Sequence, residues 1–119
     1  MAHYVDGFVA PVPKRNLDAY RRIARKAGKI WREHGALEYR ECVADDVPKG
    51  EVTSFPRSVK VKRGETVVFA WIVYKSRAHR DRVVAKVMDD PRMADMDPKD
   101  MPLDMRRMIY GGFEVIVDV

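Results

Sequence analysis

The chain has 119 residues and a mass of 13.8 kDa, which suits one domain and leaves little room for a second. Its 23 Lys and Arg against 18 Asp and Glu give a formal charge of +5, and with 46% hydrophobic residues it is neither disordered nor fibrous. No apolar run approaches the ~20 residues of a membrane-spanning helix. The opening residues 1–6 lack the basic and apolar regions of a secretory signal, and the lone Cys42 cannot form an intramolecular disulfide. We therefore expect a single domain over residues 1–119, located in the cytoplasm and without a membrane partner.

The first half of the chain predicts strand, helix and strand. Residues 3–10 form the first predicted strand, ended by prolines that cannot donate to a ladder. Residues 16–34 predict a long helix with Asn16 as N-cap and Gly35 just beyond its end. Its apolar stripe recurs at intervals of three and four residues: Leu17, Tyr20, Ala24, Ala27, Trp31 and His34. Residues 37–44 alternate well enough for a second, half-exposed strand.

A long polar stretch separates the two halves. Residues 45–65 are rich in Pro, Gly, Lys and Ser, which predicts a loop or arm. Phe55–Pro56 is its conspicuous apolar element, and we expect it to pack against the body of the protein or a partner.

The second half repeats the order. Residues 66–74 are a continuous apolar run, which predicts a strand covered on both faces. Residues 77–89 predict a helix that Ser76 caps and Asp90–Pro91 ends. Its predicted inner face holds Arg80, Val83, Val84, Val87 and Met88. A methionine-rich linker with a short helix near 103–108 and a last strand over 113–119 complete the chain.

The order β-α-β-β-α-β predicts an α+β, ferredoxin-like sandwich, with four antiparallel strands and two helices on one face. Two helices cover only one face of a sheet, yet the run 66–74 is apolar on both faces. The uncovered face therefore predicts a homodimer in which two sheets face each other, a dimeric α/β barrel.

Several strings resemble one bacterial family. They are Tyr4-Val5-Asp6-Gly7-Phe8, Trp31-Arg32-Glu33-His34-Gly35-Ala36, Ser54-Phe55-Pro56, Ser76-Arg77-Ala78-His79-Arg80-Asp81 and Met108-Ile109-Tyr110-Gly111-Gly112-Phe113-Glu114. Together they make the chain similar to the YbaA-like proteins (domain of unknown function 1428), and the resemblance covers essentially the whole chain. It implies the dimeric α/β-barrel fold and brings no activity. At the level of fold alone, the architecture is similar to antibiotic-biosynthesis monooxygenase barrels.

Five residues are candidates for a ligand site: Asp6, Trp31, His34, Trp71 and Tyr74. Large aromatics with an indole N–H or an imidazole are the usual lining of a small-molecule pocket, although the same residues can simply fill a core. An acid inside an apolar strand must face solvent, point into a polar cavity or pair with a cation, and the pairing with Arg80 or His79 is favoured. A histidine at a helix end either moves protons or caps the last turn, and capping is favoured.

Two further features leave alternatives open. The methionine-rich stretch 88–108 fits a pliable lid over an apolar ligand or packing at the dimer interface, and packing is favoured. The basic helix 16–34 could follow phosphates, but its outer face lacks interleaved aromatics, so a nucleic-acid partner is disfavoured. The three histidines match no metal-ligand spacing, so we predict neither a metal nor a cofactor.

The leading hypothesis is a small protein that binds an apolar or aromatic ligand between sheet and helices. One alternative is a cofactor-independent oxygenase or isomerase that uses His34 or Asp6 as general base. The other is an RNA-binding accessory protein that uses the basic first helix. Catalytic residues cannot be named from the sequence.

Overall fold

The computed structural model describes residues 3–119, so Met1 and Ala2 of the opening stretch lie outside the described residues. Its centre is one antiparallel sheet in the order β2-β3-β1-β4. The strands are β1 (Tyr4–Pro13), β2 (Glu38–Val43), β3 (Glu65–Tyr74) and β4 (Ile109–Glu114). The helices are α1 (Leu17–Glu33), α2 (Phe55–Ser58), α3 (Arg77–Asp89) and α4 (Pro91–Ala94), with short 3-10 turns at Lys14–Asn16, Pro98–Asp100 and Met105–Arg107.

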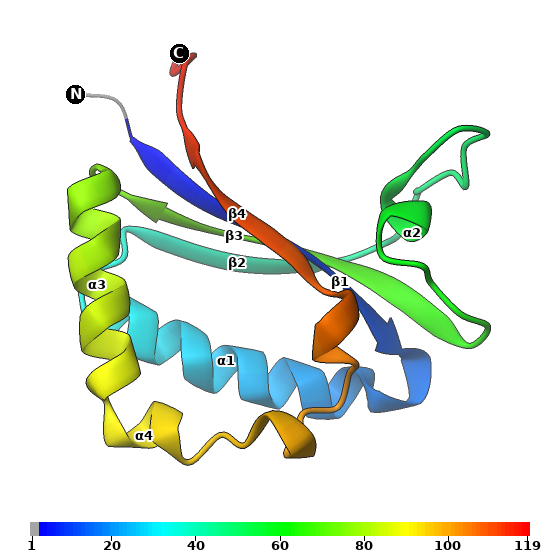
Figure 1. Ribbon diagram of the computed structural model, residues 1–119, viewed down its shortest axis with the longest axis horizontal. Coiled ribbons are helices and arrows are strands. Elements are labelled where there is room, and N and C mark those ends of the chain that lie inside the picture. The colour runs from blue at the N-terminus through cyan, green and yellow to red at the C-terminus, as the bar shows by residue number, and fades with distance from the viewer. Residues whose placement is uncertain (1–2) are drawn as a thin grey trace.

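The two long helices, α1 and α3, lie on the same face of the sheet, as Figure 1 shows. This arrangement confirms the predicted ferredoxin-like α+β sandwich. Within residues 3–119, no helix has the length and apolar character needed to cross a membrane.

The core lies between these helices and the sheet. Alternate residues of β3 point to the helices, and the cluster there contains Ile72 and Tyr74 from β3 together with Ile30, Val83 and Val87. The predicted inner face of α3 is correct for Val83 and Val87 but wrong for Met88, which is 58% exposed. One residue after Val87, the helix has turned its side chain toward solvent.

Two boundaries differ from prediction because of what each strand pairs with. β1 does not stop at Pro11 but continues to Pro13, since β4 pairs with β1 only as far as Val9 and leaves one side of the proline stretch free. A proline on such a one-sided stretch need not donate to a ladder. β4 covers 109–114 and not 113–119, because β1 begins at Tyr4, the partner of Glu114.

The helix caps also refine the prediction. Ser76 accepts a hydrogen bond from the His79 backbone N–H at the start of α3, as expected. Gly35 has φ +117°, the conformation predicted beyond the end of α1. Asn16 precedes α1 but makes no side-chain cap bond; its amide instead donates to the Pro102 carbonyl at 3.1 Å.

Within residues 3–119, residues of the arm 45–65 cover one corner of the sheet face opposite the helices. There the arm 45–65 packs as predicted, with Phe55 edge-to-face against Phe69 at 5.7 Å between ring centroids. The firmer anchor is Val59, which is 1% exposed and packs with Val9 and Val67. Phe69 remains 39% exposed beside the arm, and Phe113 on the same face is 62% exposed.

Candidate functional site

A cavity of about 190 Å³ lies between α1, the sheet and the methionine-rich connection from α4 to β4. The sheet contributes Phe8, Ala10, Val68, Ala70 and Ile72, and α1 contributes Ile23, Ala24, Ala27 and Trp31. Five methionines of the connection complete the wall: Met93, Met96, Met101, Met105 and Met108. The volume compares with the ~150 Å³ apolar cavity that is known to hold a benzene ring.

Methionine suits this position because it is unbranched and polarizable, so it fits irregular shapes and contacts aromatic rings favourably. The methionine side chains face an intramolecular cavity; packing at a dimer interface, the use favoured from sequence, stays a prediction. In Figure 1 the connection runs from α4 alongside α1 and returns to the sheet at β4.

The methionine connection is tied to both ends of α1. At the C-terminal end, the His34 Nε2 lies 2.8 Å from the Asp90 carboxylate, and Arg92 donates to Glu33 at 2.6 Å. At the N-terminal end, the Asn16 side-chain amide donates a hydrogen bond to the Pro102 carbonyl. These contacts position the methionine wall with polar groups that do not enter the cavity.

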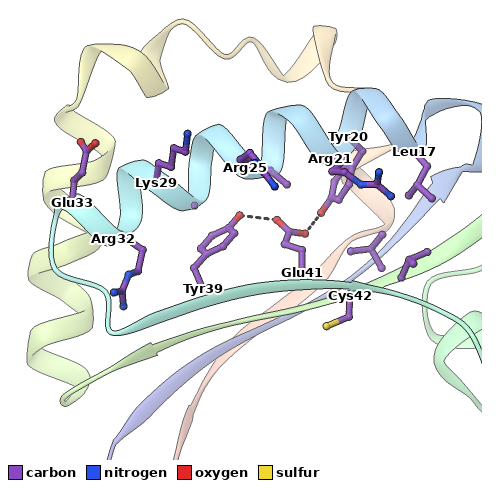
Figure 2. Close-up of a pocket in the computed structure, with 14 residues that line it drawn as sticks. Leu17, Tyr20, Arg21, Arg25, Lys29, Arg32, Glu33, Tyr39, Glu41 and Cys42 are labelled. Carbon is purple, nitrogen blue, oxygen red and sulfur yellow. Dashed lines mark hydrogen bonds between the residues drawn. The ribbon is translucent and has the colours of Figure 1, made fainter.

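The polar part of the cavity wall is a carboxylate held by two phenols. Glu41 of β2 accepts hydrogen bonds from Tyr39, at 2.6 Å, and from Tyr20 of α1 (Figure 2). Tyr39 and Glu41 are two residues apart on a strand, so both side chains face α1, where Tyr20 meets them. A carboxylate has about four lone-pair positions, so two donors leave acceptor capacity for a further polar group.

These tyrosines are fixed in their neutral form. Burial, and then the nearby Glu41 carboxylate, raise the pKa of Tyr20 and Tyr39 well above the ordinary value of 10.0. Each phenol therefore remains a hydrogen-bond donor to Glu41 throughout the physiological range.

The same three residues also line a larger groove of about 620 Å³ on the outer side, between α1 and β2. Its rim carries a row of cations on α1, at Arg21, Arg25, Lys29 and Arg32 (Figure 2). The Tyr20–Glu41–Tyr39 cluster thus separates a basic groove from an apolar cavity. Gly28 allows the close approach of α1, because a Cβ there would lie 2.7 Å from the Tyr39 ring.

Three of the five residues predicted for the site lie together beside the cavity. The Trp31 indole donates to the Tyr74 hydroxyl at 3.0 Å, and Asp6 accepts from Arg80 at 2.7 Å. Asp6 therefore has the cationic partner that the sequence favoured. Burial, and then the Asp6 carboxylate, raise the pKa of Tyr74. Of the three, only Trp31 lines the cavity itself.

The other two predicted residues lie elsewhere. His34 follows α1, as a capping residue would, but its ring is paired with Asp90 and not with last-turn carbonyls. Hydrogen bonds from Arg92, and then from His34, lower the pKa of the Asp90 carboxyl. The sequence predicts Trp71 between sheet and helices together with Trp31 and His34, and that grouping is wrong. Trp71 alternates with Ile72 and faces the open side of the sheet, where its indole donates to Glu38 at 3.1 Å.

Sequence reasoning missed Tyr20, Tyr39 and Glu41 as a group. The signal was present: Tyr20 belongs to the apolar stripe of the first helix, and Tyr39 and Glu41 occupy alternate positions of the next strand. An acid on the face of a strand that must pack beneath a helix needs donors, and tyrosines on both elements supply them. In the described part of the chain, no group of three or more His, Cys, Asp or Glu side chains could hold a metal ion.

Comparison with known proteins adds a family and a fold. A family model for proteins of unknown function (DUF1428) matches residues 3–105. The uncharacterized protein YbaA of Escherichia coli K12 is 52% identical over 115 residues, which is 97% of each chain, and the YbaA of Shigella flexneri is equally similar. The crystal structure of a dimeric ferredoxin-like protein from an uncultured marine organism aligns over 100% of both chains with a TM-score of 0.60 and 13% identity. That last likeness shows the fold alone.

Proposed function

The chain belongs to the DUF1428 family of proteins of unknown function, and we propose that it binds a small aromatic molecule in the methionine-lined cavity. The observation that carries the proposal is the composition of the wall. It is apolar almost throughout, and its polar contribution is the carboxylate of Glu41 with its two tyrosine donors. Small-molecule sites have this make-up, with apolar walls and a few placed polar groups that fix orientation.

The wall also indicates the kind of ligand. The volume of about 190 Å³ suits one aromatic ring, and thioether side chains pack well against ring edges. Glu41 retains acceptor capacity at the cavity wall, which favours a ring that carries a hydroxyl or amine donor over a bare hydrocarbon. Phenol is the simplest probe with these properties.

Binding is favoured over catalysis because both predicted general bases are engaged elsewhere. Asp6 is paired with Arg80, and His34 is paired with Asp90. Neither residue lines the cavity. A general base must reach the proton that it removes, directly or through one water.

The two tryptophans provide the test, since Trp31 lines the cavity and Trp71 lies on the other face of the sheet. In the Trp71→Phe variant, phenol should quench the remaining Trp31 fluorescence along a saturable curve. In the matched Trp31→Phe variant, phenol should leave Trp71 unchanged. Ala27→Leu, which fills the cavity, should weaken binding about tenfold or more. Quenching that does not saturate, or that is equal in both tryptophan variants, would refute the proposal.

We also propose that the protein assembles as a homodimer through the open face of the sheet. The support is the exposed Phe69 and Phe113 on that face, together with the dimeric state of the ferredoxin-like neighbour. Sedimentation at micromolar concentration should show a dimer for the wild type and a monomer for Phe69→Asp. The control, Ala85→Asp on the exposed side of α3, should remain dimeric. A monomeric wild type would refute the proposed homodimer.

A further inference from the structure

The connection from α4 to β4 concentrates the sulfur of the chain. Five of the seven methionines fall within residues 93–108, and all five line the same cavity. Each of these cavity methionines is half-buried, so an ion can reach it from solvent. Met88, which precedes them on α3, lies outside the cavity and is 58% exposed. A thioether is both an apolar group and a sulfur donor, and the aromatic ligand proposed above uses only the first property.

Two local turns bring four of the cavity methionines together in pairs. The Met96 N–H donates to the Met93 carbonyl at 3.1 Å, and the Met108 N–H donates to the Met105 carbonyl at 3.3 Å. A bond of this kind, from residue i+3 back to residue i, closes a turn of 3-10 type, in which the side chains at i and i+3 lie one above the other. Each Met-x-x-Met turn therefore presents two thioethers on one side. Both pairs, with Met101 between them in the chain, line the cavity.

The charge of the cavity wall is that of one carboxylate. Among the lining residues, all of which belong to the described part of the chain, Glu41 alone carries a charge. Burying a cation in apolar surroundings is costly unless an opposite charge lies close by. One carboxylate balances a monovalent cation and leaves a divalent cation uncompensated. The wall therefore favours an ion of charge +1.

The chemistry of the donors narrows the choice further. Thioether sulfur is a soft ligand that suits copper(I), whereas magnesium and calcium prefer oxygen ligands. Zinc is held by Cys, His and carboxylate side chains, and Glu41 is the single lining residue of that kind within residues 3–119. Donor softness and wall charge thus point to the same class of ion.

We propose that the five cavity methionines bind a soft monovalent metal ion, copper(I), with the Glu41 carboxylate as its counter-charge. Both Met-x-x-Met turns supply sulfur, so the site depends on the whole connection from α4 to β4 (Figure 1). The inference goes beyond the proposed function because it uses the lone pairs of sulfur and not the packing of an aromatic ring. The two ligands share one cavity, so each should weaken the binding of the other.

Silver(I) is the probe, because it has the charge and softness of copper(I) and is stable in air. Cys42 is the competing soft ligand; it is exposed and lines the outer groove, not the cavity, so every measurement uses the Cys42→Ser protein. Native mass spectrometry should show one silver ion per chain and no binding of zinc at the same concentration. In NMR of ¹³C-labelled methionine methyl groups, the five cavity signals should shift and Met88 should not.

Leucine variants separate ligation from packing, because leucine nearly conserves the volume of methionine and has no sulfur. Met93→Leu with Met96→Leu should weaken silver binding about tenfold or more, and so should Met105→Leu with Met108→Leu. The control, Met88→Leu, should bind silver as the parent does. Urea unfolding with a midpoint near that of the parent verifies that each pair variant is folded.

A change of charge gives an independent readout. Glu41→Gln keeps an oxygen that accepts hydrogen bonds from the two tyrosines but removes the counter-charge. It should weaken silver binding about tenfold or more while every sulfur is retained. Unchanged binding in Glu41→Gln would refute the role given to this carboxylate.

The other outcomes are distinct. An absence of silver binding at micromolar concentration refutes the site. Equal binding in the parent and both leucine pairs assigns the ion to the surface and also refutes it, and a loss confined to one pair refutes the shared use of both turns. Zinc binding as tight as silver binding refutes the soft monovalent assignment. Saturable phenol binding without silver binding refutes this inference and leaves the aromatic-binding proposal intact.

Discussion

Substituting Gly28 by alanine should destabilise the protein, although alanine is normally the better residue inside a helix. Gly28 lies in α1 against the Tyr39 ring, and an added Cβ would lie 2.7 Å and 2.9 Å from two ring carbons. Ordinary contact at such a position is 3.4–4 Å, so a ring carbon at 2.7 Å must move away by at least 0.7 Å. That ring is one of the two donors to Glu41, so the change tests how α1 and β2 together build the cavity wall.

The sign of the effect follows from two opposing magnitudes. Replacing glycine by alanine in a helix contributes about 1 kcal/mol of stability. Overpacking a well-filled site costs about 1–3 kcal/mol. Taking about 2 kcal/mol for the clash, the net loss is about 1 kcal/mol. It rises further if the ring also leaves Glu41, since a hydrogen bond to a charged group is worth about 1.5–3 kcal/mol.

Urea unfolding at one fixed protein concentration measures this directly, with Lys26→Ala on the exposed side of α1 as the matched control. The same Gly28→Ala change is then made in a Tyr39→Ala background. With the ring gone, the alanine should stabilise by about 1 kcal/mol, so the sign reverses and the coupling is about 2 kcal/mol. If Gly28→Ala stabilises the wild type, or if its effect is the same in both backgrounds, the packing argument is wrong.

Four further substitutions test the supports around the site. Val59→Ala should lower the free energy of unfolding by about 2–3 kcal/mol in urea, because Val59 is fully buried. Phe55→Ala should lower it by about 1 kcal/mol, because Phe55 is 48% exposed. A larger effect of Phe55→Ala than of Val59→Ala would contradict this reasoning. Arg107→Met should lower the free energy of unfolding by about 3 kcal/mol, because it removes the two hydrogen bonds, at 2.6 and 2.7 Å, that Arg107 donates to the largely buried Glu65 carboxylate. Adding Glu65→Gln to the same chain should restore part of this stability, because it removes the uncompensated charge. The lowered pKa of the Asp90 carboxyl means that its contribution to stability is present above its ordinary value of 3.8 and is lost as pH falls below it. The stability difference between wild type and Asp90→Asn should therefore shrink between about pH 5 and about pH 3, and a constant difference would show that the carboxylate charge is not responsible.

The fold could be predicted from sequence because its signals are local and mutually consistent. The stripe Leu17 to His34 has helical period, and the run 66–74 has the composition of a central strand. The ends of the strands are harder to predict from sequence, because each depends on where the neighbouring strand in the sheet ends. Pro11 continues β1 since β4 does not reach it, and β4 ends at Glu114 since β1 begins at Tyr4.

The candidate site is harder to predict than the fold, because it depends on which face of the sheet each residue occupies. Trp71 and Tyr74 are three residues apart in one strand, so they point to opposite faces, yet composition alone gives both equal weight. The pairing of Asp6 with Arg80 follows from the chemistry of an acid in an apolar strand. The Tyr20–Glu41–Tyr39 cluster required knowing that the first helix packs on the second strand, and that is a tertiary fact.

The most direct test of the proposed aromatic-binding cavity is a titration of the protein with phenol, followed by NMR of ¹³C-labelled methionine methyl groups. Met93, Met96, Met101, Met105 and Met108 line the cavity, whereas Met88 is exposed on α3 and serves as an internal control. Saturable shifts of the five cavity methyl groups, with Met88 unchanged, are the predicted result. Shifts that do not saturate, or a Met88 signal that moves as much as the others, would contradict the proposed function.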